Sequence, residues 1–126
     1  MNKKDTIILS GIQPSGKLHI GNYFGAIRQH IAMQDQGNAY YFIANYHSLT
    51  SLKNGKALKQ FTYEVALDYL ALGLEPEKAT FFAQSDVPQV TELAWILGSL
   101  TPVSLMEKGV SYKDKVSAGI HPNIGL

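Results

Sequence analysis

Residues 13–22 combine side chains that suit the binding of phosphate groups. The segment reads Gln-Pro-Ser-Gly-Lys-Leu-His-Ile-Gly-Asn, so Gln13, Ser15, His19 and Asn22 offer uncharged or titratable hydrogen-bonding groups. Its two glycines allow a ligand to approach the backbone closely. No carboxylate lies in it to repel a triphosphate. We call residues 13–22 the signature segment and treat it as the candidate site of phosphate chemistry.

The signature segment differs from two common phosphate-binding patterns. It lacks the Gly-Lys-Ser/Thr ending of a P-loop and the G-x-G-x-x-G spacing of dinucleotide-binding folds. From the glycines alone, an ordinary connecting loop is an equally good interpretation, with His19 as a surface or helix-cap residue. The place of the segment in the fold is therefore needed to decide between the two.

Strands are predicted to alternate with helices three times along the chain, with short connections. The predicted order is a strand over 6–10, the loop 11–20, a helix over 21–36, a strand over 40–44, a helix over 56–72, a strand over 80–84 and a third helix capped by Ser85 or Asp86. This alternation predicts a parallel sheet in a doubly wound α/β fold. In such folds ligands bind at the carboxyl ends of the strands, and helix N-termini there favour phosphate.

The spacing of apolar residues predicts which helix faces are buried. Three sets are expected to face the core, and Trp95 is expected to pack with the last of them: Phe24, Ile27 and Ile31; Leu58, Phe61, Val65 and Leu72; and Leu93, Ile96 and Leu97. Beyond Leu100 the pattern weakens. There we expect a short helix over 103–108 followed by loop to residue 126.

Composition excludes several classes of protein. The 126 residues suit one domain, 45% of them are apolar, and there is no cysteine for a disulfide scaffold or a thiolate metal site. A net charge of +1 is too small for a domain whose main task is to bind nucleic acid. The four histidines have no metal-site spacing. No apolar run suits a signal peptide or membrane span, so we expect a cytoplasmic protein without a membrane partner.

Residues 14–22 resemble the first signature of class I aminoacyl-tRNA synthetases, His-Ile-Gly-His, with Asn22 in place of the last histidine. The preceding stretch, Ser10 to Gly16, resembles the tryptophanyl-tRNA synthetase branch of that class. The resemblance continues through four further segments and so covers nearly the whole chain: residues 46–50, 70–76, 82–88 and 112–115. It implies a Rossmann-like catalytic domain.

The resemblance also implies roles for individual residues in activating tryptophan with ATP, which brings Mg²⁺ as part of the substrate. Gln13, Pro14, Ser15, Gly21 and Asn22 would bind ATP, and His19 would hydrogen-bond its phosphates as a catalytic residue together with Asn22. No site for a metal held by the protein itself is implied.

Other residues are implied to serve the tryptophan pocket or to reach the phosphates. Leu9, Gly11 and His47 would line the tryptophan pocket, although a satisfied histidine at a strand end is the other interpretation of His47. Lys115, or less directly Lys113, would reach the ATP phosphates as a catalytic group. A solvated Lys-Asp-Lys stretch explains these two lysines equally well.

By the resemblance, residues 1–126 form only the N-terminal part of a catalytic domain. No Lys-x-Ser-Lys-like loop and no anticodon-binding domain are present. We therefore expect the chain alone to be inactive and its first strand to have an unpaired edge. The complete enzyme would act on tryptophan, ATP and tRNA(Trp), as a homodimer.

Three alternatives remain open. Small adenylyltransferases use a similar loop after the first strand, although the Gln13-Pro14-Ser15 stretch and the segment around His47 argue against them. A non-catalytic nucleotide-binding or regulatory module fits if 126 residues is the native length. Tyrosine specificity is the third alternative.

Overall fold

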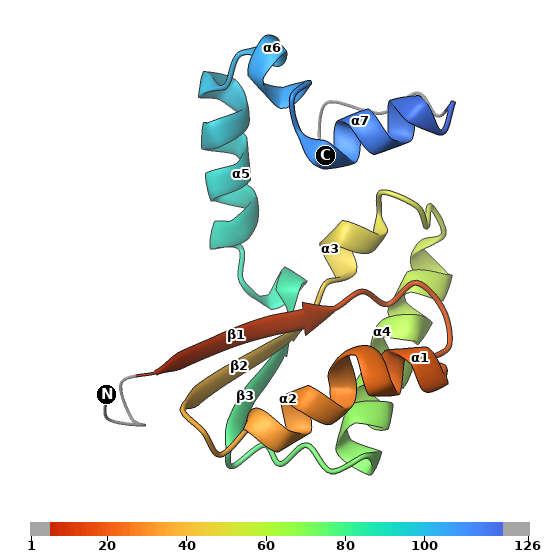
Figure 1. Ribbon diagram of the computed structural model, residues 1–126, viewed down its shortest axis with the longest axis vertical. Helices are drawn as coiled ribbons and strands as arrows, with labels where there is room; N and C mark the ends of the chain where they lie inside the picture. The colour runs from red at the N-terminus through yellow and green to blue at the C-terminus, as the bar shows by residue number, and fades with distance from the viewer. Residues whose placement is uncertain (1–5, 120–126) are drawn as a thin grey trace. The chain divides into compact units, whose positions relative to one another are not determined.

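The computed structural model describes residues 6–119. The chain divides into two compact units, Met1–Val87 and Pro88–Leu126, and each is described by itself. The first unit holds the sheet and the signature segment (Figure 1).

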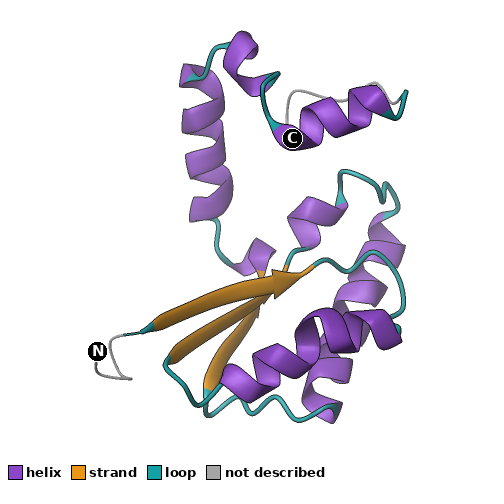
Figure 2. Ribbon diagram, viewed as in Figure 1, coloured by secondary structure: helices purple, strands orange, loops and turns teal. Residues whose placement is uncertain are grey.

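Three parallel strands form the sheet of the first unit, in the order β1-β2-β3 (Figure 2). They span Ile7–Ile12, Asn38–Ile43 and Ala79–Ala83. Leu9 pairs with Tyr40, and Gly11 pairs with Phe42. The predicted parallel α/β fold is confirmed, and the three strands lie within two residues of their predicted bounds.

Helices follow each strand. In the first unit they are α1 (Ile20–Asn22), a π-helical turn η2 (Tyr23–Ile27), α2 (Arg28–Met33), α3 (Asn45–Ser48), α4 (Gly55–Ala71) and a 3-10 turn η3 (Gln84–Asp86). Figure 1 shows α2 and α4 on the same side of the sheet.

The core lies between these helices and one face of the sheet. Ile27 from the first helix and Val65 and Tyr69 from α4 are almost fully buried, as are Tyr41 and Ile43 from β2. Val65 and Tyr69 are one helical turn apart, which is the spacing that puts two side chains on one face of α4. This packing fixes the strands whose carboxyl ends carry the candidate site.

The other face of the sheet carries exposed apolar side chains. Ile7 and Leu9 of β1 are 71% and 66% exposed, although a short apolar run such as theirs is typical of a buried strand. The physical reason is that β1 has only β2 as a neighbour among residues 6–119, and the described helices of this unit cover the opposite face. Among residues 6–119, β1 therefore pairs on one side only, as expected.

The first helix differs from its prediction as one regular helix over 21–36. It begins at Ile20, passes through the π turn and ends at Met33. A π turn adds a residue to the helical repeat and so shifts the apolar pattern. As a result Ile27 is buried while Phe24, predicted to face the core, is 54% exposed.

The helix α4 confirms its prediction to within one residue at each end. Asn54 caps it, since Oδ1 accepts a hydrogen bond from the Ala57 N–H at 3.1 Å. Gly73, at φ 109°, takes the left-handed conformation that ends the helix. Leu72 lies beyond the last helical turn and is 44% exposed, so its predicted inward position is wrong.

The second unit contains three helices among its described residues, α5 (Gln89–Leu100), α6 (Val103–Met106) and α7 (Val110–Ser117). No residue of α5 is buried, so the inward positions predicted for Leu93, Ile96 and Leu97 are wrong. Trp95 is 79% exposed and does not pack as expected. The reason is that these helices bring no sheet or second layer to cover the apolar side chains.

Two further predictions for this region are wrong. Asp86 accepts a hydrogen bond from the Ala83 N–H at 3.0 Å and so caps η3, whereas the N-cap of α5 is Pro88. Residues 110–117 form α7 instead of loop, because Gly109 and Gly119 bracket a stretch without glycine or proline. Residues 120–126 of the predicted loop lie outside the described residues.

Among residues 6–119, no helix has both the length and the apolar character that crossing a membrane requires.

We expect the chain to become less stable in acid because His30 is buried. Its Nδ1 is 2.9 Å from the hydroxyl of Tyr69, and its ring stacks on Tyr41 at 4.7 Å. Burial lowers the pKa of His30 below its ordinary value of 6.5. The unfolded chain therefore binds a proton that the folded chain resists, so the free energy of unfolding should fall as the pH drops below 6.5 and level off below the folded-state pKa.

Urea unfolding between about pH 5 and pH 7 measures this effect. We expect His30→Gln to flatten the pH dependence, because glutamine does not titrate. His47→Gln is the matched control, since it replaces an exposed histidine and leaves the contact between His30 and Tyr69 in place. Equal slopes for the native chain and His30→Gln would contradict the prediction.

Candidate functional site

The signature segment leaves the carboxyl end of β1 and ends in α1. Pro14 is fully buried and fixes the loop to the body of the unit, while Gln13 is half-buried and Ser15 is exposed. The Ser15 N–H donates to the Gln13 carbonyl at 3.0 Å, which closes a tight turn. The loop thus has a rigid base and an accessible tip at the predicted end of the sheet.

His19 and Asn22 cap the start of the helix reciprocally. The Gly21 N–H donates to Nδ1 of His19 at 3.1 Å, and the His19 N–H donates to Oδ1 of Asn22 at 3.0 Å. These bonds satisfy backbone donors that a helix start otherwise leaves unpaired. The helix-cap interpretation of His19 is therefore correct as far as Nδ1 is concerned.

The cap leaves the second nitrogen of His19 available for a ligand. A backbone N–H can only donate, so Nδ1 is the acceptor and the neutral ring carries its proton on Nε2. His19 is exposed, and Nε2 makes no hydrogen bond with another residue of the described chain. A directed N–H donor therefore stands at a helix N-terminus, where anions are favoured.

The imidazole of His19 lies against Gly21 and leaves little room for a side chain there. A Cβ at Gly21 would be 2.9 Å from Cε1 of His19, closer than side chains normally approach. Gly25, one turn later in the same helix, has no heavy atom within 4 Å of a Cβ built there. The two glycines therefore form a matched pair for testing the cap.

We expect Gly21→Ala to be less stable than Gly25→Ala by about 1–2 kcal/mol in urea unfolding. Each change gains helix propensity, but only Gly21→Ala displaces the His19 cap. The ¹⁵N shifts of the His19 imidazole should report the loss of the fixed tautomer in Gly21→Ala alone. Equal stability of the two variants, with unchanged imidazole shifts, would show that the cap does not depend on this contact.

The predicted tryptophan-pocket residues of β1 lie on the face of the sheet that the helices leave uncovered. Leu9 and Gly11 alternate with residues of the core face, and Leu9 is 66% exposed. The ring of Phe42 fills the space beside Gly11, since a Cβ there would be 2.8 Å from two ring carbons. Phe42 is the residue that sequence reasoning missed here, and the parallel register of β1 and β2 was the signal that could have found it.

His47 lies on α3, just beyond the carboxyl end of β2. Its side chain is exposed and makes no hydrogen bond with another residue in the described range. Its backbone N–H donates to Oε1 of Gln84 at 3.3 Å, so the start of η3 contacts the same turn. The signature segment, Gly11 and His47 therefore lie together at the carboxyl ends of β1 and β2.

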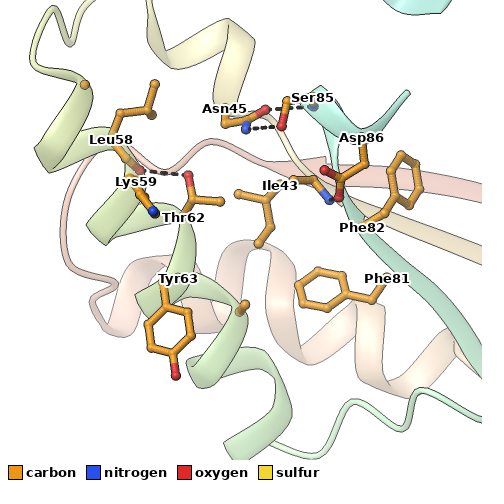
Figure 3. A pocket seen from close by; sticks show the side chains of 13 residues that line it. Ile43, Asn45, Leu58, Lys59, Thr62, Tyr63, Phe81, Phe82, Ser85 and Asp86 are labelled. Atoms are coloured by element: carbon orange, nitrogen blue, oxygen red, sulfur yellow. Dashed lines mark hydrogen bonds between the residues drawn. The ribbon is translucent and has the colours of Figure 1, made fainter. Parts of the chain in front are cut away.

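Two cavities in the first unit have linings that bear on the site. One of about 590 Å³ lies between α4 and the carboxyl end of β3, and its lining includes Asn45, Ser85 and Asp86 but none of the predicted site residues (Figure 3). Another of about 470 Å³ has His19 in its otherwise largely apolar lining, with the carboxylate of Asp68. That carboxylate disfavours phosphate inside the second cavity.

Lys115 and Lys113 lie on α7 in the second unit, where Lys115 is half-buried and Lys113 exposed. The part of the chain that the structure describes contains no group of three or more histidine, cysteine, aspartate or glutamate residues able to hold a metal ion.

Comparison with known proteins decides the family. The model of the family described as tRNA synthetases class I (W and Y) matches residues 1–125. This chain belongs to the class I tRNA synthetases of the tryptophan and tyrosine type. The expected Rossmann-like α/β fold of that class is confirmed by its solved relatives.

The individual relatives are tryptophan enzymes. A tryptophan–tRNA ligase of Fusobacterium nucleatum is 60% identical over 118 residues, which are 94% of this chain and 36% of that protein. A structure of tryptophanyl-tRNA synthetase from Campylobacter jejuni, complexed with ADP and tryptophan, superposes with a TM-score of 0.84 at 49% identity, over 95% of this chain and 38% of that one. The enzyme of Mycoplasma pneumoniae gives a TM-score of 0.81 at 33% identity, over 95% of this chain and 35% of that one.

This class I synthetase chain thus spans a little over a third of the length of these relatives.

Proposed function

We propose that this chain supplies the ATP-binding signature and part of the tryptophan pocket of a tryptophan–tRNA ligase. The observation that carries the proposal is the reciprocal cap of His19 and Asn22, which leaves Nε2–H of His19 free at a helix N-terminus beyond β1. Membership of the synthetase family and the 60% identity to a tryptophan–tRNA ligase support it. Residues 1–126 are then the N-terminal part of a Rossmann-like catalytic domain.

The proposed reaction joins tryptophan to AMP. A carboxylate oxygen of tryptophan attacks the α-phosphorus of ATP, the bond from that phosphorus to the bridging oxygen breaks, and pyrophosphate leaves with its Mg²⁺. Such transfers depend on positioning and charge stabilisation more than on covalent help from the protein. A hydroxyl of the terminal ribose of tRNA(Trp) then attacks the carbonyl carbon of the adenylate, which forms the ester bond, breaks the bond to the phosphate oxygen and releases AMP and a proton.

The chain's own residues bind and orient the two substrates in this proposal. Nε2–H of His19 donates to the phosphates, where negative charge builds up as the reaction proceeds. The helix N-terminus at α1 adds its partial positive charge. Asn22 retains Nδ2 for the nucleoside, because only Oδ1 is used in the cap. Gln13, Pro14, Ser15 and Gly21 shape the ATP site.

The tryptophan side is formed by β1 and α3. Leu9 and Gly11 lie against the indole, and His47 stands at the pocket with a free imidazole. Lys115, and less directly Lys113, add positive charge toward the phosphates. We place the enzyme in the cytoplasm, where tRNA is charged, and expect it to act as a homodimer.

A chimera tests the proposal, because the chain spans only part of its relatives. The matched 118 residues of this chain would replace the corresponding segment of the Fusobacterium nucleatum ligase. We expect ATP–pyrophosphate exchange that depends on tryptophan and not on tyrosine, at a rate within about tenfold of the parent enzyme. A chimera that folds, by circular dichroism, yet exchanges only with tyrosine or with neither amino acid would contradict the proposal.

A further inference from the structure

We infer that Asn45 and Ser85 form a clamp that positions the His47 turn and thereby sets the affinity for tryptophan. Only the part of the inference that concerns the affinity for tryptophan rests on the proposed function. The Asn45–Ser85 clamp joins the carboxyl ends of β2 and β3, on whose continuations α3 and η3 stand. In Figure 3 the two side chains point toward one another, and two dashed lines join the Asn45 side chain to Ser85, one of them at the Ser85 backbone nitrogen.

The hydrogen bonds of the clamp fix the orientation of the amide. The Ser85 N–H, which can only donate, lies 3.1 Å from Oδ1 of Asn45, so this atom is the carbonyl oxygen. The same Oδ1 accepts from the Tyr46 N–H at 3.0 Å. Nδ2 must then face Ser85, and it donates to Oγ at 2.7 Å. Both ends of the Asn45 amide are thus engaged across 40 residues of sequence.

The turn that carries His47 depends on these contacts because it is short. The helix α3 has four residues, far fewer than an isolated helix needs for stability. Ser48 anchors its end in the core, where it is fully buried. At its start, the clamp and the bond from the His47 N–H to Gln84 hold α3 to η3. The exposed imidazole of His47 is therefore placed by residues that are not among the proposed substrate-binding residues.

Asn45 and Ser85 are accordingly positioning residues. Small displacements of a binding group change affinity or rate strongly, by up to about a hundredfold for roughly 1 Å. Because the clamp lies on the His47 side and not at the signature segment, its loss should weaken tryptophan binding and leave ATP binding unchanged.

Three variants separate positioning from general stability. Asn45→Leu removes every bond of the clamp at similar volume. Ser85→Ala removes only the Oγ bond and keeps the Ser85 N–H to Oδ1 bond, so it still tests the inference if Asn45→Leu does not fold. Asn45→Asp is the rescue variant, since its second oxygen accepts from the Ser85 hydroxyl, which is able to donate as well as accept.

Amide hydrogen exchange on the full 126-residue chain tests the local part without reference to function. We expect the His47 amide to exchange about tenfold faster in Asn45→Leu, less so in Ser85→Ala, and as in the native chain in Asn45→Asp. The Ile43 amide in β2 should not change. Unaltered exchange at His47, or equal acceleration at Ile43, would overturn the inference.

Kinetics of the chimera described above test the tryptophan part. We expect KM for tryptophan to rise about ten- to a hundredfold in Asn45→Leu, with KM for ATP within about twofold and recovery in Asn45→Asp. Equal rises in both KM values, or no recovery with aspartate, would overturn it. An unmodified chimera without exchange activity would contradict the proposed function and with it the tryptophan part, while the amide exchange would still decide whether the clamp holds the turn.

Discussion

Replacement of His19 by alanine is expected to lower tryptophan-dependent pyrophosphate exchange of the chimera by about 10²–10³-fold, the usual effect of removing one donor aimed at developing charge. The reason is that Nε2–H of His19 stands free beyond the helix start while Nδ1 is held by the Gly21 N–H. The measurement is kcat/KM for ATP in the exchange reaction.

His19→Asn separates the two tasks of this histidine. Asparagine is among the best N-cap residues, so it should keep the helix start and the free energy of unfolding. The asparagine side chain is shorter than that of histidine, so it cannot place an N–H donor where Nε2–H of His19 lies. We expect His19→Asn to be as stable as the native sequence yet nearly as inactive as His19→Ala. Full activity of His19→Asn would reduce the role of His19 to capping.

The second large effect is expected at Gly11. A Cβ there would be 2.8 Å from two ring carbons of Phe42 and equally close to its carbonyl oxygen, which cannot move without shifting β2. We therefore expect Gly11→Ala to lower the free energy of unfolding by about 3 kcal/mol, at the upper end of the usual cost of overpacking. Urea unfolding of the chain measures it.

Gly55→Ala serves as the control for Gly11→Ala. It lies at the first position of α4, and no heavy atom is within 4 Å of a Cβ built there. Its stability should equal or slightly exceed that of the native chain. If Gly11→Ala were as stable as Gly55→Ala, the close packing of β1 on Phe42 would be contradicted.

The parts of the fold that the sequence predicted well depend on local patterns. The three strands follow from short apolar runs, and α4 follows from its apolar spacing together with Gly73. The signature segment was placed correctly after β1 because it continues a strand and precedes a helix. These features need only neighbouring residues for their explanation.

The features that the sequence did not predict depend on distant residues or on missing layers. No local sequence pattern singles out His30, because its partner Tyr69 lies 39 residues away. The π turn has no residue type that marks it, and it turns Phe24 outward. Leu9 and Trp95 have sequences around them that are typical of buried elements, but burial requires a neighbouring layer, which the described residues do not supply at these positions.

In the candidate site, too, residue types predict some features, while others depend on how the chain folds. The types of the signature residues predict phosphate chemistry, but the reciprocal cap of His19 and Asn22 and the free Nε2 depend on side-chain geometry that residue types do not specify. The predicted roles of Gln13, Ser15 and Lys115 stay predictions.

A crystal structure of the chimera with a non-hydrolysable tryptophanyl-adenylate analogue is the most direct test of the central claim. We expect Nε2 of His19 within hydrogen-bonding distance, about 3 Å, of a phosphate-equivalent oxygen, and the indole beside Gly11 and His47. An analogue bound elsewhere, with no contact between it and residues 13–22, would contradict the account.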